Sequence, residues 1–367
     1  MKRYIALLLL FLTALTLISC QKTTTLSPEE EWMESTSKTY GAMQVSSAKI
    51  AYNYLTGENN LAEDRVGKKP YSVSVNNIAG GWPQSGISSA DIIIEIETEG
   101  GITRMMCLFT DTREIPYIGS IRSLRDQFME ALYPIDPIFV HIGTSILADK
   151  SVNEHGIRTL DGDYLRDMIY FDRSRYSQGY NWEYCSFTSG QQVFDAVQKT
   201  KMPEDSHMKV KSYFNFAEEG EVVIPEAGEA TRINFLISND KVYDGDFRYD
   251  EASGTYLKWQ HGAVQKDVGD PKEPIDVQLA FTNVFVLFAN ITVLPNMAGL
   301  VSVDYNSGGT GYYFSGGHYE QITWSKADYE APFQFTKVSD GTDLVVNAGK
   351  SYLCMSRVVN EKTIAIV

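Results

Sequence analysis

The feature that most constrains this chain is a predicted hairpin between residues 91 and 109, with a glycine pair at its turn. In residues 91–98 apolar and charged side chains alternate, which predicts a strand. Residues 100 and 101 are both glycine and predict a tight turn, and residues 102–109 predict the returning strand. Successive strand side chains point to opposite faces. The expected faces are therefore Ile92, Ile94 and Ile96 on one side, and Glu95, Glu97 and Glu99 on the other.

The three glutamates are candidates for acid–base chemistry. Residues two apart in a strand lie about 6.5–7 Å from each other, so their carboxylates interact. When such groups are partly buried, the like charges raise the pKa of at least one of them, which yields a general acid at neutral pH. Glu95 and Glu99 are the candidate catalytic residues, and Glu97 is the third choice for the catalytic acid. The alternative is that these charges form the solvated face of a half-buried sheet.

Basic side chains follow the hairpin closely. Arg104 begins the returning strand, and Arg122 and Arg125 flank the start of a helix predicted over residues 124–132. A helix start also favours an anion. These three arginines are therefore candidates for positioning a substrate.

Two other polar residues of this region have simpler structural interpretations. Ser123 with Asp126 three residues on matches a capping box, which predicts that Ser123 begins the helix and is no nucleophile. Residues 137–143 predict a buried strand that carries His141. A single histidine in an apolar strand is more often a hydrogen-bonded core residue than a catalyst.

The same region carries an ordered series of residues. They are Asn77, residues 83–86, Ala90 with Asp91, Glu95, residues 99–104, Arg122 with Ser123, Arg125, and residues 139–141. In this series the chain resembles the YerB-type family of bacterial lipoproteins, long known only as a domain of unknown function. The similarity covers residues 54–200 and extends more loosely through Asn283 with Val284, residues 308–317 and residues 324–326. We assign Asn77, Gln84 and His141 to substrate binding, together with the three arginines. The family's Gly-Pro-Val-Arg-Ser segment reads Gly-Ser-Ile-Arg-Ser at residues 119–123.

The first 20 residues predict a lipoprotein signal peptide. A basic start and a short apolar core end in Leu-Ile-Ser-Cys, which resembles a lipobox with Cys20 as the lipidated residue. No other stretch approaches the length of a transmembrane helix. The mature protein is therefore expected to be lipid-anchored on the extracytoplasmic face of the bacterial cytoplasmic membrane. Residues 21–53 are predicted to form a flexible tether.

The remaining chain is long enough for two cores. Residues 54–205 predict an α+β N-terminal domain with a mixed sheet, including further helices at 161–169 and 190–199. Residues 170–184 form a loop dense in aromatic side chains, which can stack on sugar rings or cover a core. Residues 206–367 predict a mainly β C-terminal domain because short alternating segments recur between Asp-Gly and Gly-Gly turns.

Composition excludes several functions. The chain has 32 basic and 47 acidic residues, and loss of Lys2 and Arg3 with the signal peptide moves the net charge from −15 to −17. Nucleic acid is therefore no expected partner. No zinc, phosphate-loop or dinucleotide motif is present, so neither a metal site nor a cofactor is expected. The oligomeric state does not follow from the sequence.

Two hypotheses of function remain. The first is an enzyme that cleaves peptidoglycan glycan strands in the manner of a lytic transglycosylase, with Glu95 or Glu99 as general acid and base. The second is a non-catalytic envelope lipoprotein that binds glycan or a partner protein. Carboxylates exposed in a cleft favour the enzyme. A closed network of ion pairs favours the binding protein.

Overall fold

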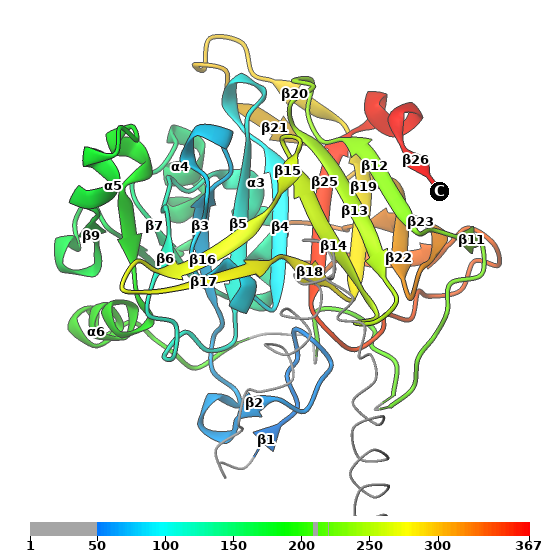
Figure 1. Cartoon of the computed structure of the whole chain (residues 1–367), viewed down its shortest axis with the longest axis horizontal. Coiled ribbons are helices and arrows are strands. Elements are labelled where there is room, and N and C mark those ends of the chain that lie inside the picture. Colours follow the sequence, from blue (N-terminus) through cyan, green and yellow to red (C-terminus); the bar gives the residue numbers. More distant parts are fainter. Residues whose placement is uncertain (1–49, 208–211, 219) are drawn as a thin grey trace, which may run out of the picture. The chain divides into compact units, whose positions relative to one another are not determined.

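The predicted hairpin lies at the centre of an eleven-stranded mixed sheet (Figure 1). The computed structural model describes residues 50–207, 212–218 and 220–367. Strand β4 (Ile92–Glu97) pairs antiparallel with β5 (Thr103–Phe109) on one side and parallel with β25 (Ser351–Arg357) on the other. Because β25 comes from the end of the chain, the N-terminal and C-terminal halves of the protein contribute strands to the same sheet.

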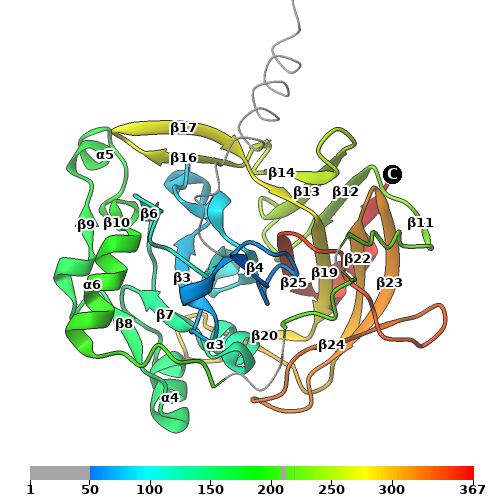
Figure 2. The same ribbon diagram turned by 90° about the horizontal axis from the view of Figure 1, so that it is seen from below.

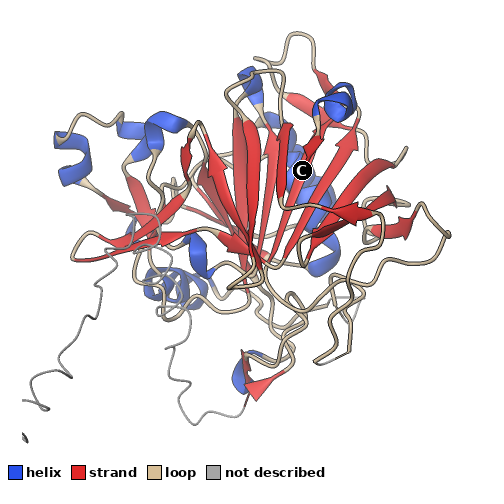
Figure 3. Cartoon of the chain, turned by 45° about the vertical axis from the view of Figure 1, so that its right-hand side comes forward, coloured by secondary structure: helices blue, strands red, loops and turns tan. Residues whose placement is uncertain are grey.

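The large sheet runs from short edge strands in the C-terminal half to short edge strands in the N-terminal half. Its order is β11 (Gly228–Glu229), β23 (His318–Ser325), β22 (Gly309–Ser315), β19 (Asn283–Ala289), β25, β4, β5, β3 (Tyr71–Asn76), β7 (Ile138–His141) and β8 (Thr159–Asp161), with β24 (Gln334–Lys337) beside β23. Figure 3 shows its long central strands side by side.

A second sheet of six strands covers one face of the large sheet (Figure 2). Apolar side chains of β12, β13 and β14 pack there against β4, β19 and β25, for example Phe247 against Tyr352, with ring centroids 5.2 Å apart. The six strands are β15 (Ala263–Val264), β14 (Thr255–Gln260), β13 (Asp244–Asp250), β12 (Arg232–Leu236), β26 (Ala365–Ile366) and β18 (Ala280–Phe281).

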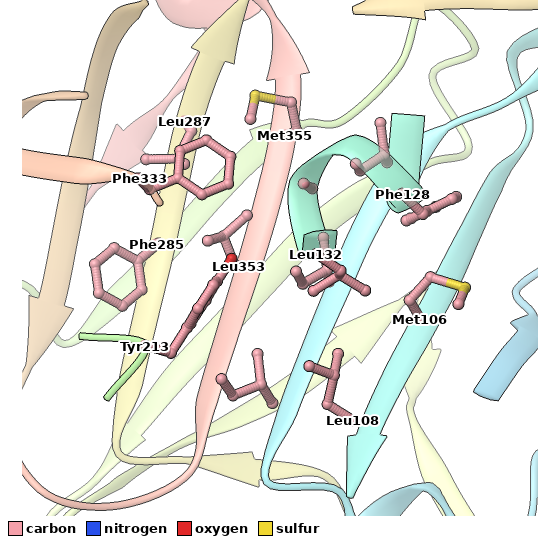
Figure 4. Packing of buried hydrophobic residues seen from close by; sticks show 14 of the residues in the cluster. Met106, Leu108, Phe128, Leu132, Tyr213, Phe285, Leu287, Phe333, Leu353 and Met355 are labelled. Atoms are coloured by element: carbon pink, nitrogen blue, oxygen red, sulfur yellow. The ribbon is translucent and has the colours of Figure 1, made fainter. Parts of the chain in front are cut away.

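Helix α3 (Asp126–Leu132) covers the opposite face (Figure 4). Its Phe128 and Leu132 pack in one cluster with Met106 and Leu108 of β5. Ile92, Ile94 and Ile96 lie in the same cluster, whereas Ile93 lies in the cluster on the other face. The predicted alternation of β4 is therefore confirmed, but both of its faces are buried.

The remaining elements surround the two sheets. The helices are α4 (Ile146–His155), α5 (Arg173–Ser177) and α6 (Gly190–Thr200); the smaller sheets are β1 (Ile50–Ala51) with β2 (Leu61–Ala62), β6 (Ile118–Gly119) with β10 (Ser186–Thr188) and β9 (Tyr170–Phe171), β16 (Lys266–Asp270) with β17 (Glu273–Gln278), and β20 (Ile291–Val293) with β21 (Val301–Val303).

The β16–β17 hairpin reaches from the C-terminal half across the N-terminal half (Figures 1 and 2). Its buried Asp267 accepts hydrogen bonds from the backbone N–H groups of Gly86, at 2.9 Å, and Ser88, at 2.8 Å. This contact and the shared large sheet bind the two halves to each other, and the described residues belong to one compact unit.

The α+β N-terminal region with a mixed sheet and the mainly β C-terminal region are confirmed. The hairpin turn is also as predicted, because Gly100 and Gly101 have φ angles of 72° and 78°, which favour glycine. A helix over 161–169 is wrong: only a short 3₁₀ helix, η6 (Arg166–Met168), forms there. Within the described part of the chain, no helix is both long and apolar enough to cross a membrane.

The predicted capping box is also wrong. Arg125 is the residue that precedes α3, and no side chain caps the helix. The Ser123 carbonyl instead accepts hydrogen bonds from the Ser74 hydroxyl and the Arg104 guanidinium. Segment 122–124 pairs with segment 142–144, which holds Ser123 in an extended stretch ahead of the helix.

Candidate functional site

Glu95 lies in a closed polar network between the two sheets. Its Oε1 accepts hydrogen bonds from Asn77 Nδ2 at 2.6 Å, Thr103 Oγ1 at 2.5 Å and Gln260 Nε2 at 2.9 Å. Its Oε2 accepts one from the Tyr352 hydroxyl. Glu95 has no solvent-exposed surface. No water-filled approach therefore leads to this carboxylate.

A buried lysine balances the charge of Glu95. Lys258 Nζ lies 3.7 Å from Glu95 Oε2 and donates to Gln260 Oε1 at 3.1 Å, and its side chain is fully buried. Burial lowers the pKa of Lys258, and the adjacent Glu95 carboxylate acts in the opposite direction. The lysine comes from β14 in the second sheet, so the network fastens the two sheets together.

Asn77 and Gln84 belong to this closed network. The side-chain oxygen of Asn77, Oδ1, accepts hydrogen bonds from Gln84 Nε2 at 3.2 Å and from Gln265 Nε2 at 3.1 Å. Asn77, Gln84 and Gln265 are all fully buried. The structure thus brings Asn77 and Gln84 together with Glu95, as a structural group inside the protein.

Glu97 is engaged separately. Its two carboxylate oxygens accept from Arg357 Nε and Nη2, each at 2.6 Å. Arg357 also donates to the Ile291 carbonyl at 2.6 Å. This bidentate pair is of the strong, orientation-specific kind, and it leaves Glu97 with a partner of opposite charge. Glu97 is therefore not the unpaired like charge beside Glu95 that the alternating glutamates predicted.

Glu99 lies beyond β4, in the 3₁₀ helix η4 (Glu99–Gly101), and forms a bidentate ion pair with Arg125. Partial burial raises the pKa of Glu99, but the hydrogen bonds from Arg125 and the charges of Arg104 and Arg125 outweigh it, and lower the pKa to about 2. Glu99 is therefore ionised at neutral pH. The three glutamates do not form one interacting group, because each has its own cationic partner.

Burial lowers the pKa of Arg104, and the nearby charges of Arg125 and Arg122 act in the same direction, so the three arginines lie near one another. Arg104 is 2% exposed and donates from Nη1 to the Ser123 carbonyl at 2.7 Å. It pairs with Ile96 in the sheet, so it lies on the face opposite Glu95. Arg122 forms an ion pair with Glu183, at 2.7 Å. The three arginines predicted to bind substrate are thus together, but away from Glu95. We call Arg104, Arg122 and Arg125 the arginine cluster.

His141 ends β7 and is fully buried. Its Nδ1 lies 2.9 Å from the carbonyl oxygen of Gly143 and 3.9 Å from Asp161 Oδ1. Burial lowers the pKa of His141, and Asp161 acts against this effect. The structure therefore fits the core interpretation of this histidine. Cys20, the predicted lipidation residue, lies outside the described residues.

Sequence reasoning missed the partners of Glu95 in the second half of the chain. They are Lys258, Gln260 and Tyr352, and Gln265 joins the network through Asn77. A signal did exist in residues 255–260, where polar and apolar residues alternate as in a strand with one solvated face. In the structure Lys258 and Gln260, on the polar face of this strand, are buried.

An exposed group of aromatic side chains lies in residues 164–182, around β9, α5 and η7 (Trp182–Tyr184). This "aromatic surface" consists of Tyr164, Tyr170, Phe171, Tyr176 and Trp182, exposed by 86, 49, 39, 55 and 65%. Two alternatives were open for this loop, a sugar-stacking surface or a cover over the core. The exposed fractions of Tyr170, Phe171, Tyr176 and Trp182 do not fit a cover over the core, and Tyr164 lies ahead of this loop.

A separate cavity of about 520 Å³ lies at the end of β19, β22 and β23. Trp324, Gly308 and Gly309 are among its lining residues. A Cβ on Gly309 would lie 2.1 Å from the Phe288 carbonyl oxygen, so close strand packing accounts for a glycine there. None of the predicted site residues lines this cavity. In the described ranges no group of three or more His, Cys, Asp or Glu side chains is placed to hold a metal ion.

Comparisons with known proteins agree with the fold. Residues 55–203 match the family described as "Protein of unknown function (DUF3048) N-terminal domain", and residues 233–353 match the C-terminal domain of that family. The Bacillus subtilis (strain 168) protein named "Putative lipoprotein YerB" is 26% identical over 288 residues, 78% of this chain and 80% of that protein. The crystal structure of YerB from Bacillus subtilis superposes with a TM-score of 0.68 at 24% identity, covering 86% of this chain and 99% of the other.

Proposed function

The chain belongs to the YerB-type family of bacterial lipoproteins, and we propose that it is a non-catalytic, lipid-anchored envelope protein that binds cell-wall glycan. The observation that carries this proposal is the engagement of all three candidate acids. Glu95 lies in a closed network, Glu97 is held by Arg357 and Glu99 by Arg125.

The lipid anchor is supported by two observations. The first 20 residues end in Leu-Ile-Ser-Cys, and the relative from Bacillus subtilis is named as a lipoprotein. Lipid on Cys20 would hold the folded part at the extracytoplasmic face of the cytoplasmic membrane, within reach of the cell wall.

The state of the candidate acids argues against glycan cleavage. A general acid must carry a proton and reach the leaving oxygen of the substrate. Glu95 has no exposed surface through which a sugar could reach it. Glu99 has a pKa of about 2 and carries no proton at neutral pH. Neither of these candidate acids therefore meets both requirements.

The aromatic surface supports glycan as the ligand. Aromatic rings offer an apolar face and, in Tyr and Trp, a polar edge, which suits a sugar ring with alternating C–H and hydroxyl groups. Exposed aromatic groups gathered in one region also mark binding surfaces more generally. A net charge of −15 for the whole chain disfavours strongly acidic polymers and leaves a neutral or mixed-charge glycan acceptable.

Co-sedimentation with purified peptidoglycan sacculi tests the proposal. A soluble polypeptide of residues 21–367, which lacks the lipidated Cys20, should sediment with sacculi, and replacement of Trp182 and Tyr176 by alanine should weaken binding about tenfold. Tyr52→Ala is the matched control, because Tyr52 is 46% exposed and lies outside the aromatic surface. Failure of the wild-type polypeptide to sediment would contradict glycan binding.

A further inference from the structure

The arginine cluster contains more positive charge than the described groups around it neutralise. Two carboxylates pair with it: Glu99 with Arg125, and Glu183 with Arg122. Among the described residues Arg104 forms no ion pair of its own, although the charges of Glu99 and Glu183 act on it. Three guanidinium groups therefore face two carboxylates in a largely buried setting, where an unbalanced charge is costly.

Asp126 does not supply the missing charge. It follows Arg125 directly in the chain, but one of its carboxylate oxygens is buried without a hydrogen-bond partner. Burial raises the pKa of Asp126, with smaller opposing effects from backbone N–H groups at the start of α3 and from Arg125. No ion pair links Asp126 to any of the three arginines among the described residues.

The hydrogen-bond donors of the cluster are used unevenly. Arg125 donates from all three guanidinium nitrogens, two to Glu99 and one to the Leu124 carbonyl. Within the described part of the chain, Arg104 donates from Nη1 to the Ser123 carbonyl, and Arg122 Nε is buried without a partner. A buried donor left without an acceptor destabilises the fold. The cluster thus lacks both a negative charge and a hydrogen-bond acceptor.

The position of the cluster in the fold is one where ligands bind. Strands β3, β7 and β8 are parallel, and their carboxyl ends carry Asn76, His141 and Asp161. Segment 122–124 lies beside the chain that leaves β7. Ligands of open sheets with parallel strands bind in the crevice outside these carboxyl ends.

Further unused polar groups lie at the same edge. Asn76 Nδ2 and His141 Nε2 are buried without partners, and both residues are at most 2% exposed. Gly143 has a φ of 68°, which favours glycine; a Cβ there would lie 3.1 Å from Asp163 Oδ2 and 3.5 Å from Ser123 Oγ, so the Asp163 carboxylate borders the same space. A side chain at residue 143 would therefore narrow the space beside Ser123.

We propose that Arg104 and Arg122, with the Ser123 hydroxyl, form a binding site for one oxyanion, a carboxylate or phosphate group. The planar guanidinium fork matches the geometry of both groups. The bound oxyanion supplies the missing charge and accepts from Arg104 and from Arg122 Nε. The site is distinct from the aromatic surface, and the proposal holds whether or not the protein binds glycan.

Anion titration of the soluble polypeptide of residues 21–367 tests this site. Inorganic phosphate and acetate are each compared with chloride at matched ionic strength, by thermal melting and by NMR of the arginine Nε–H groups. We expect a saturable rise of Tm with phosphate or acetate and a saturable shift of the Arg122 Nε–H signal. The anion with the lower Kd identifies the preferred oxyanion.

Two variants and a control complete the test. Arg122→Gln changes a side chain that is 19% exposed, and should raise Kd about tenfold. Arg104→Lys keeps the charge but loses the fork, and should weaken binding as well. Arg113→Gln, at a surface arginine paired with Asp64 and Asp111, should leave Kd unchanged. A rise of Tm equal in chloride, or an equal Kd in folded Arg122→Gln and Arg113→Gln, would overturn the proposal.

Discussion

The Glu95 network and the arginine cluster lie on opposite faces of the same hairpin and differ in how completely they are satisfied. Around Glu95, each carboxylate oxygen has a donor, and Lys258 supplies the opposite charge. Around Arg104, one guanidinium lacks a carboxylate and a neighbouring donor lacks an acceptor. The Glu95 carboxylate therefore finds its donors within the protein, whereas the proposed oxyanion completes the arginine cluster.

The difference shows how charged residues in one motif can have different roles. A buried group with all its partners present costs most when one partner is removed. A buried group without a partner raises the stability of the folded protein most when a ligand that pairs with it is added. Stability measurements should therefore detect the Glu95 network, and ligand titrations should detect the arginine cluster.

The largest expected effect is loss of stability on Glu95→Gln. The substitution keeps the shape of the side chain but leaves Lys258 as a buried charge without its counterion. We expect the free energy of unfolding to fall by about 3 kcal/mol, measured by urea denaturation. Adding Lys258→Met should restore part of it, because the unpaired charge is then removed. A Glu95→Gln protein as stable as wild type would show that the network is not structural.

A smaller effect is expected for Glu99→Gln, about 1–2 kcal/mol, because the Glu99–Arg125 pair is partly exposed. The pKa of Glu99 is lowered from 4.5 to about 2 in the folded protein. The pair therefore stabilises the fold above pH about 4.5, and this contribution is lost as the pH falls towards about 2. Unfolding at a series of pH values should show a loss in wild type that is reduced in Glu99→Gln. Equal pH profiles would contradict the assigned pair.

The smallest effect on stability is expected at the aromatic surface. Trp182 is 65% exposed, so Trp182→Ala should change the free energy of unfolding by no more than about 0.5 kcal/mol. Its effect on sedimentation with sacculi should be much larger than its effect on stability. A strongly destabilised Trp182→Ala protein would instead show that this residue supports the fold.

Local patterns predicted the hairpin well because its determinants are close in the sequence. Alternation in residues 91–98 and the glycine pair are sufficient to define β4, the turn and β5. The burial of Glu95 could not be predicted this way, because Lys258 and Tyr352 come from strands more distant in the chain. A glutamate in an alternating strand is typical of a solvated face, and only the second sheet makes it a core residue.

The start of α3 was predicted wrongly for a related reason. Ser123 and Asp126 have the spacing of a capping box, but segment 122–124 pairs with segment 142–144 and is held extended. Tertiary pairing therefore overrides the local signal. The same pairing brings the predicted arginines together, so their grouping was predictable from their nearness in sequence, whereas their separation from Glu95 was not.

The most direct test of whether the hairpin acids are structural is mass spectrometry of the material that the soluble polypeptide of residues 21–367 releases from purified sacculi. The central claim is that the acids of the hairpin are structural and that the protein does not cleave glycan. The account predicts no released muropeptides above the buffer control at neutral pH, from a wild-type protein that is folded by thermal melting. Release of anhydro-ended or reducing-ended muropeptides by wild type, lost in a folded Glu95→Gln or Glu99→Gln variant, would contradict it and identify the catalytic acid.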